Sequence, residues 1–110
     1  MLPSYILTVD IISNNIAIGE EEFQELTFHS LSHLQALKGA FDKRPVDVSY
    51  YPPGSRNYAK GWSVQCVLMI SVGRERAEHL MHLYRAIVDL IVFEMPDFVV
   101  HSESGRFEFS

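Results

Sequence analysis

The chain has 110 residues, with nine Lys and Arg residues against fourteen Asp and Glu residues, which gives a formal net charge of −5. This length predicts one domain spanning residues 1–110, and the 47% share of hydrophobic residues favours a folded core over disorder. A single cysteine excludes an internal disulfide framework and any zinc site built on cysteines.

The first half of the chain predicts a strand, a helix and a second strand. Residues 5–12 are rich in β-branched side chains and alternate between two faces, as a strand does. A helix is expected from residue 20 to about residue 41, because three glutamates occupy its first turn and apolar residues recur at helical spacing. Residues 46–51 predict the second strand. Phe28 is expected to be exposed, and the core face of the helix is Phe23, Leu26, Thr27, Ser30, Leu34, Leu37 and Phe41.

The second half predicts a strand, a helix and a closing hairpin. Residues 62–72 form the clearest strand pattern, and residues 74–95 form the clearest helix pattern, which Pro96 ends. Two short strands, 98–101 and 106–109, are expected around the turn residues 102–105. The core stripe of this helix is Ala77, Leu80, Met81, Tyr84, Ile87, Val88 and Ile91.

The order of these elements is β–α–β–β–α–β, with a possible extra C-terminal strand. It predicts an α+β ferredoxin-like sandwich, in which two helices cover one face of a mainly antiparallel sheet. The other face would be open and partly apolar, with Ile6, Ile12, Val67 and Met69 on it. The second helix also has an apolar flank beside its core stripe, at Leu83 and Leu90. Extra apolar surface of this kind indicates an interface, with a homodimer as the simplest form.

Targeting and membrane segments are not expected. The first basic residue is Lys38, so the basic region of a secretory signal is missing. The longest uncharged stretch, residues 61–73, is too short to cross a bilayer. The sequence therefore predicts a soluble cytoplasmic protein without a membrane partner, in which Cys66 is a small buried hydrophobe.

Four histidines form two helical pairs. His29 and His33 are four residues apart, whereas His79 and His82 are three residues apart, and both spacings place two imidazoles on one side of a helix. They are weak candidates for a metal site, because the pairs lie on different helices. Boundary or surface histidines are the favoured interpretation, and we expect no cofactor.

The segment 60–67 partly resembles the first ribonucleoprotein motif of RNA-recognition domains. Lys60, Gly61 and Trp62 supply the basic residue, the glycine and the aromatic ring that begin this motif. Val64 and Val67 replace its two further aromatic rings. The resemblance implies an RNA-binding domain as a third hypothesis, although the net negative charge opposes binding to nucleic acid.

The long connection between the second and third strands is the leading candidate for a contact surface. Tyrosine and arginine dominate the strong contacts of protein interfaces, and long loops are often functional. The alternative is a mobile loop whose tyrosines cover the edge of the sheet. The candidate partner-binding residues here are Tyr50, Tyr51, Arg56, Tyr58 and Lys60.

Signatures of enzymes are absent, since the chain has no phosphate-binding glycine loop, no GxSxG motif and no HExxH motif. The leading hypothesis is a non-catalytic interaction module that binds a larger protein or nucleoprotein. Small, acidic proteins without catalytic motifs are typical of phage-encoded inhibitors, including anti-CRISPR proteins, and the acidic helix could occupy a basic groove. The candidate contact residues on this helix are Glu20, Glu21, Glu22, Glu25 and Phe28.

The alternative hypothesis is a dimeric ferredoxin-like domain that binds a small ligand or catalyses a simple reaction. Its acid or base would be His101 or Asp10, at the boundary between the sheet and the helices. A small ligand would then raise the thermal stability of the domain.

Overall fold

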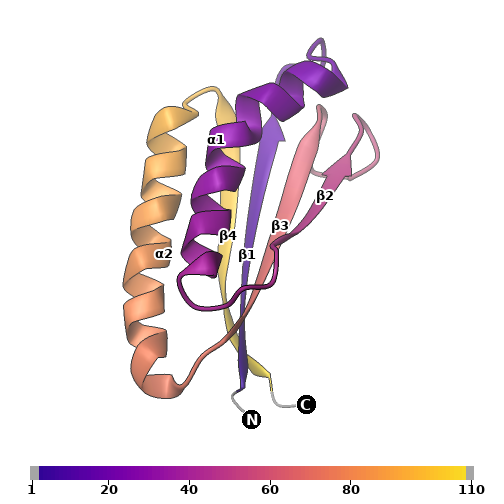
Figure 1. The fold of residues 1–110 in the computed structure, drawn as a ribbon. Helices are drawn as coiled ribbons and strands as arrows, with labels where there is room; N and C mark the ends of the chain where they lie inside the picture. Colours follow the sequence, from indigo (N-terminus) through magenta and orange to yellow (C-terminus); the bar gives the residue numbers. More distant parts are fainter. Residues whose placement is uncertain (1–2, 109–110) are drawn as a thin grey trace.

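The computed structural model describes residues 3–108 and contains two helices and four strands (Figure 1). In chain order they are β1 (Ser4–Ser13), α1 (Glu20–Gly39), β2 (Asp47–Tyr51), β3 (Ser63–Ser71), α2 (Arg74–Glu94) and β4 (Phe98–Glu108). The expected strands and helices are confirmed up to α2, with small differences at their ends.

The four strands form one sheet in the order β2–β3–β1–β4, and every neighbouring pair is antiparallel. Both helices lie on the same face of this sheet, side by side (Figure 1). This arrangement confirms the predicted ferredoxin-like sandwich. The face of the sheet that the helices leave uncovered is called the open face below.

The core lies between the sheet and the two helices, as the alternation in the strands predicts. Every second residue of β1 and β3 points at the helices and has no exposed surface: Leu7, Val9, Ile11, Val64, Cys66, Leu68 and Ile70. From the helices, Phe23, Leu34, Leu80, Tyr84 and Ile91 complete this core. Phe28 is 63% exposed, which confirms its predicted position.

One prediction of burial is wrong. Leu26 was expected in the core but is 46% exposed. It lies at the edge of the apolar face of α1, where it lines a surface hollow with Pro96 and Phe98 instead of packing under the helix. Ile12 lies on the open-face side of β1, as expected, but it is almost fully buried. It shares a row of the sheet with Ser63, which is also buried and contacts the loop between β2 and β3.

The expected C-terminal hairpin is also wrong, because residues 98–108 form one strand that pairs with β1 along its length. Phe109, the last residue of the expected hairpin, lies outside the described residues. Tyr5 pairs with Phe107 and Leu7 pairs with Ser104, so β4 has one residue more than β1 in this interval. This is a β-bulge opposite Ile6. The Ser104-Gly105 pair, which predicts a turn in the sequence, therefore lies at a bulge within a continuous strand.

A buried lysine holds the C-terminal end of α1 against the sheet. The Nζ of Lys38 donates a hydrogen bond of 2.9 Å to the carbonyl oxygen of Met69 and lies 3.8 Å from the Asp42 carboxylate. Burial lowers the pKa of Lys38. The hydrogen bonds from Arg44 hold the pKa of Asp42 well below its usual range, which favours the ionised carboxylate beside the Lys38 ammonium group.

Tyr84 connects α2 to the sheet through its hydroxyl group, which donates to the carbonyl oxygens of Thr8 and Glu103 at 2.9 and 3.3 Å. Burial raises the pKa of Tyr84 from 10.0 to about 12. Between these two values the unfolded chain loses the proton and the folded chain keeps it, so unfolding becomes more favourable as the pH rises.

We therefore expect the free energy of unfolding to fall between pH 10 and pH 12, with about 2 kcal/mol of this fall due to Tyr84. The variant Tyr84→Phe should be less stable at pH 8 by about 1 kcal/mol, because it loses the hydrogen bonds, and its alkaline decrease should be smaller by the part due to Tyr84, while the part due to the raised pKa of the buried Cys66 thiol remains. Urea unfolding at several pH values measures both effects. Tyr58→Phe, at an exposed tyrosine, is the control and should keep the decrease; an equal decrease in Tyr84→Phe would contradict the assignment.

Candidate docking surface

The two segments that the sequence singles out lie at the same end of the molecule (Figure 1). The N-terminal turns of α1 and the loop of residues 52–62 meet there over an aromatic cluster. The ring of Phe23 lies 6.1 Å from Tyr50, 6.4 Å from Trp62 and 6.1 Å from Phe98, between ring centroids. The fold therefore brings together two candidate regions that are some 30 residues apart in the chain.

The loop of residues 52–62 is folded onto the open face through Arg56. The Nη1 atom of Arg56 donates to the Asp10 carboxylate at 3.0 Å and to the Ser63 hydroxyl at 3.3 Å. Its guanidinium group lies between two rings, 4.4 Å from the centroid of Tyr51 and 4.5 Å from that of Tyr58. The side chains of Arg56 and Asp10 are only 12% and 14% exposed. We call this arrangement the Arg56 clamp.

The clamp divides the predicted loop residues into two groups. Tyr50, Tyr51 and Arg56 are partly or largely buried and are occupied by contacts within the chain. Tyr58 and Lys60 remain exposed. Asp10, which the sequence suggested as an acid or base, is instead the counter-ion of Arg56. A search for acidic residues on the inner strands could have found this partner, because a buried arginine needs one.

The acidic helix presents a mixed apolar and acidic flank to solvent. Glu21, Gln24, Glu25 and Phe28 line a shallow hollow of about 570 Å³ on α1. Glu20 and Glu22 are exposed on the same turns. Glu25 is three positions before Phe28, and Glu21 is four positions before Glu25, so the Phe28 ring and these carboxylates lie on the same side of the helix. We call Glu21, Gln24, Glu25 and Phe28 the α1 docking flank.

More negative charge lies on the side of α1 that faces α2. Leu26 shares a hollow of about 170 Å³ with Glu94, the last residue of α2, and with Asp97, which follows the helix. The Nε2 atom of His33 lies 3.4 Å from the Glu94 carboxylate. Glu94 and Asp97 therefore lie at the same end of the molecule as the acidic first turns of α1, which the sequence pattern did not determine.

The structure does not bring the two histidine pairs together into a site. His33 faces Glu94, and the ring of His29 lies 5.9 Å from that of Phe28. His79 packs near Phe41, and His82 is exposed on α2. Among residues 3–108, no three His, Cys, Asp or Glu side chains are grouped as a metal ion would require.

The segment that resembles a ribonucleoprotein motif has a structural role at its first residues. Trp62 packs against Phe23 on the helix side of the sheet, and not on the open face where an RNA base would stack. A Cβ atom on Gly61 would lie 2.5 Å from the carbonyl oxygen of Ser13, so the glycine permits a close approach of two backbones. Lys60 alone of the three is exposed.

The remaining candidates for chemistry are the Cys66 thiol and the neighbouring residues His101 and Asp10. Burial raises the pKa of the Cys66 thiol to about 12, so the thiolate that a nucleophile requires is disfavoured. His101 is the cross-strand neighbour of Asp10 on β4, is exposed, and has its ring 6.5 Å from Tyr58. The carboxylate beside it is already bound to Arg56.

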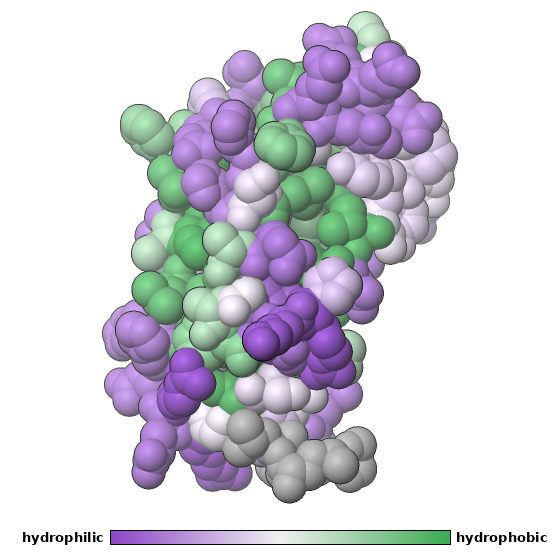
Figure 2. Space-filling model, in the orientation of Figure 1, coloured by the Kyte–Doolittle hydropathy of each residue, from purple (hydrophilic) through white to green (hydrophobic). Residues whose placement is uncertain are grey.

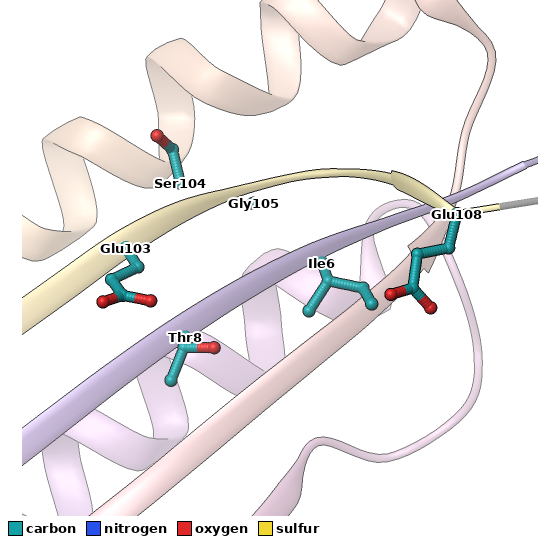
Figure 3. Close-up of a pocket in the computed structure, with 6 residues that line it drawn as sticks. All are labelled: Ile6, Thr8, Glu103, Ser104, Gly105 and Glu108. Carbon is teal, nitrogen blue, oxygen red and sulfur yellow. The ribbon is translucent and has the colours of Figure 1, made fainter.

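A hollow of about 350 Å³ lies beside the β-bulge, lined by Ile6, Thr8, Glu103, Ser104, Gly105 and Glu108 (Figure 3). Glu103, Thr8 and Ile6 project to one side of the sheet, and Ser104 projects to the other, toward the helices (Figure 3). Its polar side chains are two carboxylates and two hydroxyl groups, with no basic group among the lining residues.

These features define a class of protein: an α+β sandwich with an acidic end, one exposed aromatic ring on its first helix and a loop that is fixed to the sheet. No protein-family model, no curated protein and no solved structure matches the chain. Within residues 3–108, neither helix is both long and apolar enough to span a membrane.

Proposed function

We propose that this protein is a non-catalytic interaction module that binds a larger protein through the α1 docking flank. The observation that carries the proposal is Phe28, a phenylalanine that is 63% exposed among the carboxylates of α1. Protein interfaces usually have large aromatic side chains at their centre and polar or charged residues at their rim.

Phe28 supplies the apolar part of this contact. Full burial of such a side chain contributes about 1.5–3 kcal/mol, which corresponds to a change of roughly 10-fold or more in affinity. Since Phe28 lies on a regular helix that is packed on the sheet, its backbone is fixed before binding. Little backbone conformational entropy is then lost when a partner covers the ring.

The acidic residues determine the kind of partner. Glu20, Glu21, Glu22 and Glu25 lie within two turns of α1, and the whole chain has a net charge of −5. Such a surface attracts a basic partner and accelerates association with it. Within this proposal, the partner surface is a basic groove of a nucleic-acid-binding protein, and the module acts as an inhibitor of the phage type by occupying it.

The test starts from a pull-down with the tagged chain from a lysate of the source organism, followed by affinity measurements on the captured protein. We expect Phe28→Ala to weaken binding at least 10-fold, because the ring is lost from the centre of the contact. The variant with Lys at positions 20, 21, 22 and 25 should bind more weakly and with a smaller dependence on salt.

Tyr58→Ala is the control, since Tyr58 is an exposed aromatic residue on the loop and lies outside the α1 docking flank. It should bind as the natural chain does. If Tyr58→Ala lost affinity while Phe28→Ala and the lysine variant retained it, the loop would be the docking surface and the α1 docking flank would be excluded. Competition between the module and nucleic acid for the partner tests the inhibitor role.

A further inference from the structure

The Arg56 clamp has the composition of a binding site for a guanidinium cation. Two tyrosine rings contact the guanidinium group, with 4.4 Å and 4.5 Å between its central carbon atom and the ring centroids. The Asp10 carboxylate and the Ser63 hydroxyl group accept hydrogen bonds from its Nη1 atom at 3.0 and 3.3 Å. Aromatic faces and a carboxylate are the groups with which proteins recognise arginine. In this structure the arginine in the site belongs to the chain itself.

Most of the site is held in place by the sheet, independently of Arg56. Asp10, Ser63 and Tyr51 lie on the paired strands β1, β3 and β2. The backbone beside Arg56 is also fixed, because the amide nitrogen of Ala59 donates to the carbonyl oxygen of Arg56 at 3.1 Å, and Ala59 is buried. Rotation of the Arg56 side chain alone therefore opens the site and leaves these three groups where they are.

Arg56 uses only part of the hydrogen-bonding capacity of the site. Both of its hydrogen bonds come from Nη1, and among the described residues its Nε and Nη2 atoms have no acceptor. Of the two Asp10 carboxylate oxygens, only Oδ1 accepts a hydrogen bond from the described part of the chain. A guanidinium group that is not attached to this loop can donate from two nitrogen atoms to both oxygens, which is the stronger arrangement.

We propose that the clamp is a binding site for an alkylguanidinium cation, such as the side chain of arginine, and that Arg56 closes this site in the free protein. The arriving cation replaces the guanidinium group of Arg56, whose side chain turns to solvent. Because one guanidinium group is exchanged for another, the Asp10 carboxylate keeps an opposite charge beside it throughout.

This site is separate from the α1 docking flank. The clamp lies on the open face, whereas Figures 1 and 2 view the molecule from the side of the two helices. In Figure 2, mainly hydrophilic residues surround the first turns of α1, where the docking flank begins. Binding of a guanidinium cation is therefore tested without any protein partner, and its failure would leave the proposed function unchanged.

The experiment titrates N-ethylguanidinium into the folded chain near neutral pH and follows binding by two-dimensional NMR. The variant Arg56→Ala has an open site, so the backbone signals of Asp10, Tyr58 and Ser63 should shift with a dissociation constant on the order of 1 mM. In the natural chain Arg56 occupies the site, and the apparent affinity should be at least 10-fold lower.

The matched control is Arg56→Ala combined with Asp10→Ala, in which the site is open but lacks the carboxylate. It should bind N-ethylguanidinium at least 10-fold more weakly than Arg56→Ala does. The cation should also raise the Tm of Arg56→Ala but not that of the double variant, so the test holds where the single substitution lowers stability. Absence of saturable binding to Arg56→Ala at about 50 mM, or equal binding by the two variants, would overturn the proposal.

Two further probes of Arg56→Ala distinguish the source of the cation. N-acetyl-L-arginine amide represents an arginine within a polypeptide, whereas L-arginine represents the free amino acid. Both contain the guanidinium group that the site recognises, and the one that binds more tightly identifies the source. N-ethylurea, which has a similar shape but no charge, should not shift the NMR signals; shifts as large as those with N-ethylguanidinium would contradict recognition of the cation.

Discussion

The variant Asp10→Ala is expected to lower the free energy of unfolding by about 3 kcal/mol. It removes the carboxylate that lies 3.0 Å from Arg56 but leaves the guanidinium group in the clamp, with 12% of its side chain exposed. The Arg56 charge would still be removed from water, but no carboxylate would compensate for the cost of this desolvation. Urea unfolding of the two proteins measures the difference.

Two further variants separate the charge from the packing. Arg56→Met in the Asp10→Ala background should recover most of the loss, because no unpaired charge is then buried. Arg44→Ala removes an ion pair with Asp42. Because the Arg44 side chain is 63% exposed, this substitution should change the free energy of unfolding little. If Asp10→Ala were as stable as the natural chain, Arg56 would have to leave the clamp for solvent.

The variant Gly105→Ala is expected to lower the free energy of unfolding by about 2 kcal/mol, with a decrease in Tm of roughly 10 °C. At the β-bulge, a Cβ atom on Gly105 would lie 1.5 Å from the carbonyl oxygen of Ile6, which is far inside van der Waals contact. Backbone atoms cannot rotate away as a side chain does, so the pairing of β4 with β1 must change. Thermal unfolding followed by circular dichroism measures the effect.

Gly39→Ala is the matched control for this prediction. A Cβ atom on Gly39, in the last turn of α1, would have no neighbour within 4 Å. This substitution should leave stability unchanged or raise it by up to about 1 kcal/mol, because alanine loses less backbone entropy in a helix. If Gly105→Ala and Gly39→Ala changed the free energy of unfolding equally, contact with Ile6 would not be the reason for a glycine at position 105.

The fold could be predicted largely from hydrophobic periodicity. Across β3 and its two flanking residues, six alternate positions from Trp62 to Val72 are apolar, and α2 has its core stripe at helical spacing, so both elements were expected close to their observed bounds. The order of elements then leaves few ways to cover one sheet with two helices. The continuity of the C-terminal strand was missed because Ser-Gly is a turn signal in the sequence, and only contact with Ile6 shows that it forms a bulge.

The candidate site was predictable only in part. The exposed position of Phe28 follows from its angle on the helix, and the acidic residues around it follow from the same geometry. The Arg56 clamp does not follow from local sequence, because it joins Arg56 to a residue 46 positions away. Leu26 was placed in the core because it lies at the margin of the apolar face, where neighbouring elements decide burial.

The β-bulge has a consequence for the behaviour of the chain at high concentration. β4 is an outer strand of the sheet and spans eleven residues, about twice the usual length of a strand. A long straight outer strand offers its free backbone groups to strands of other molecules and so promotes aggregation. The bulge interrupts the regular spacing of those groups near Gly105, and the nearby carboxylate of Glu103 adds charge. The irregularity that makes Gly105 necessary thus also makes this border a poor template for fibril growth.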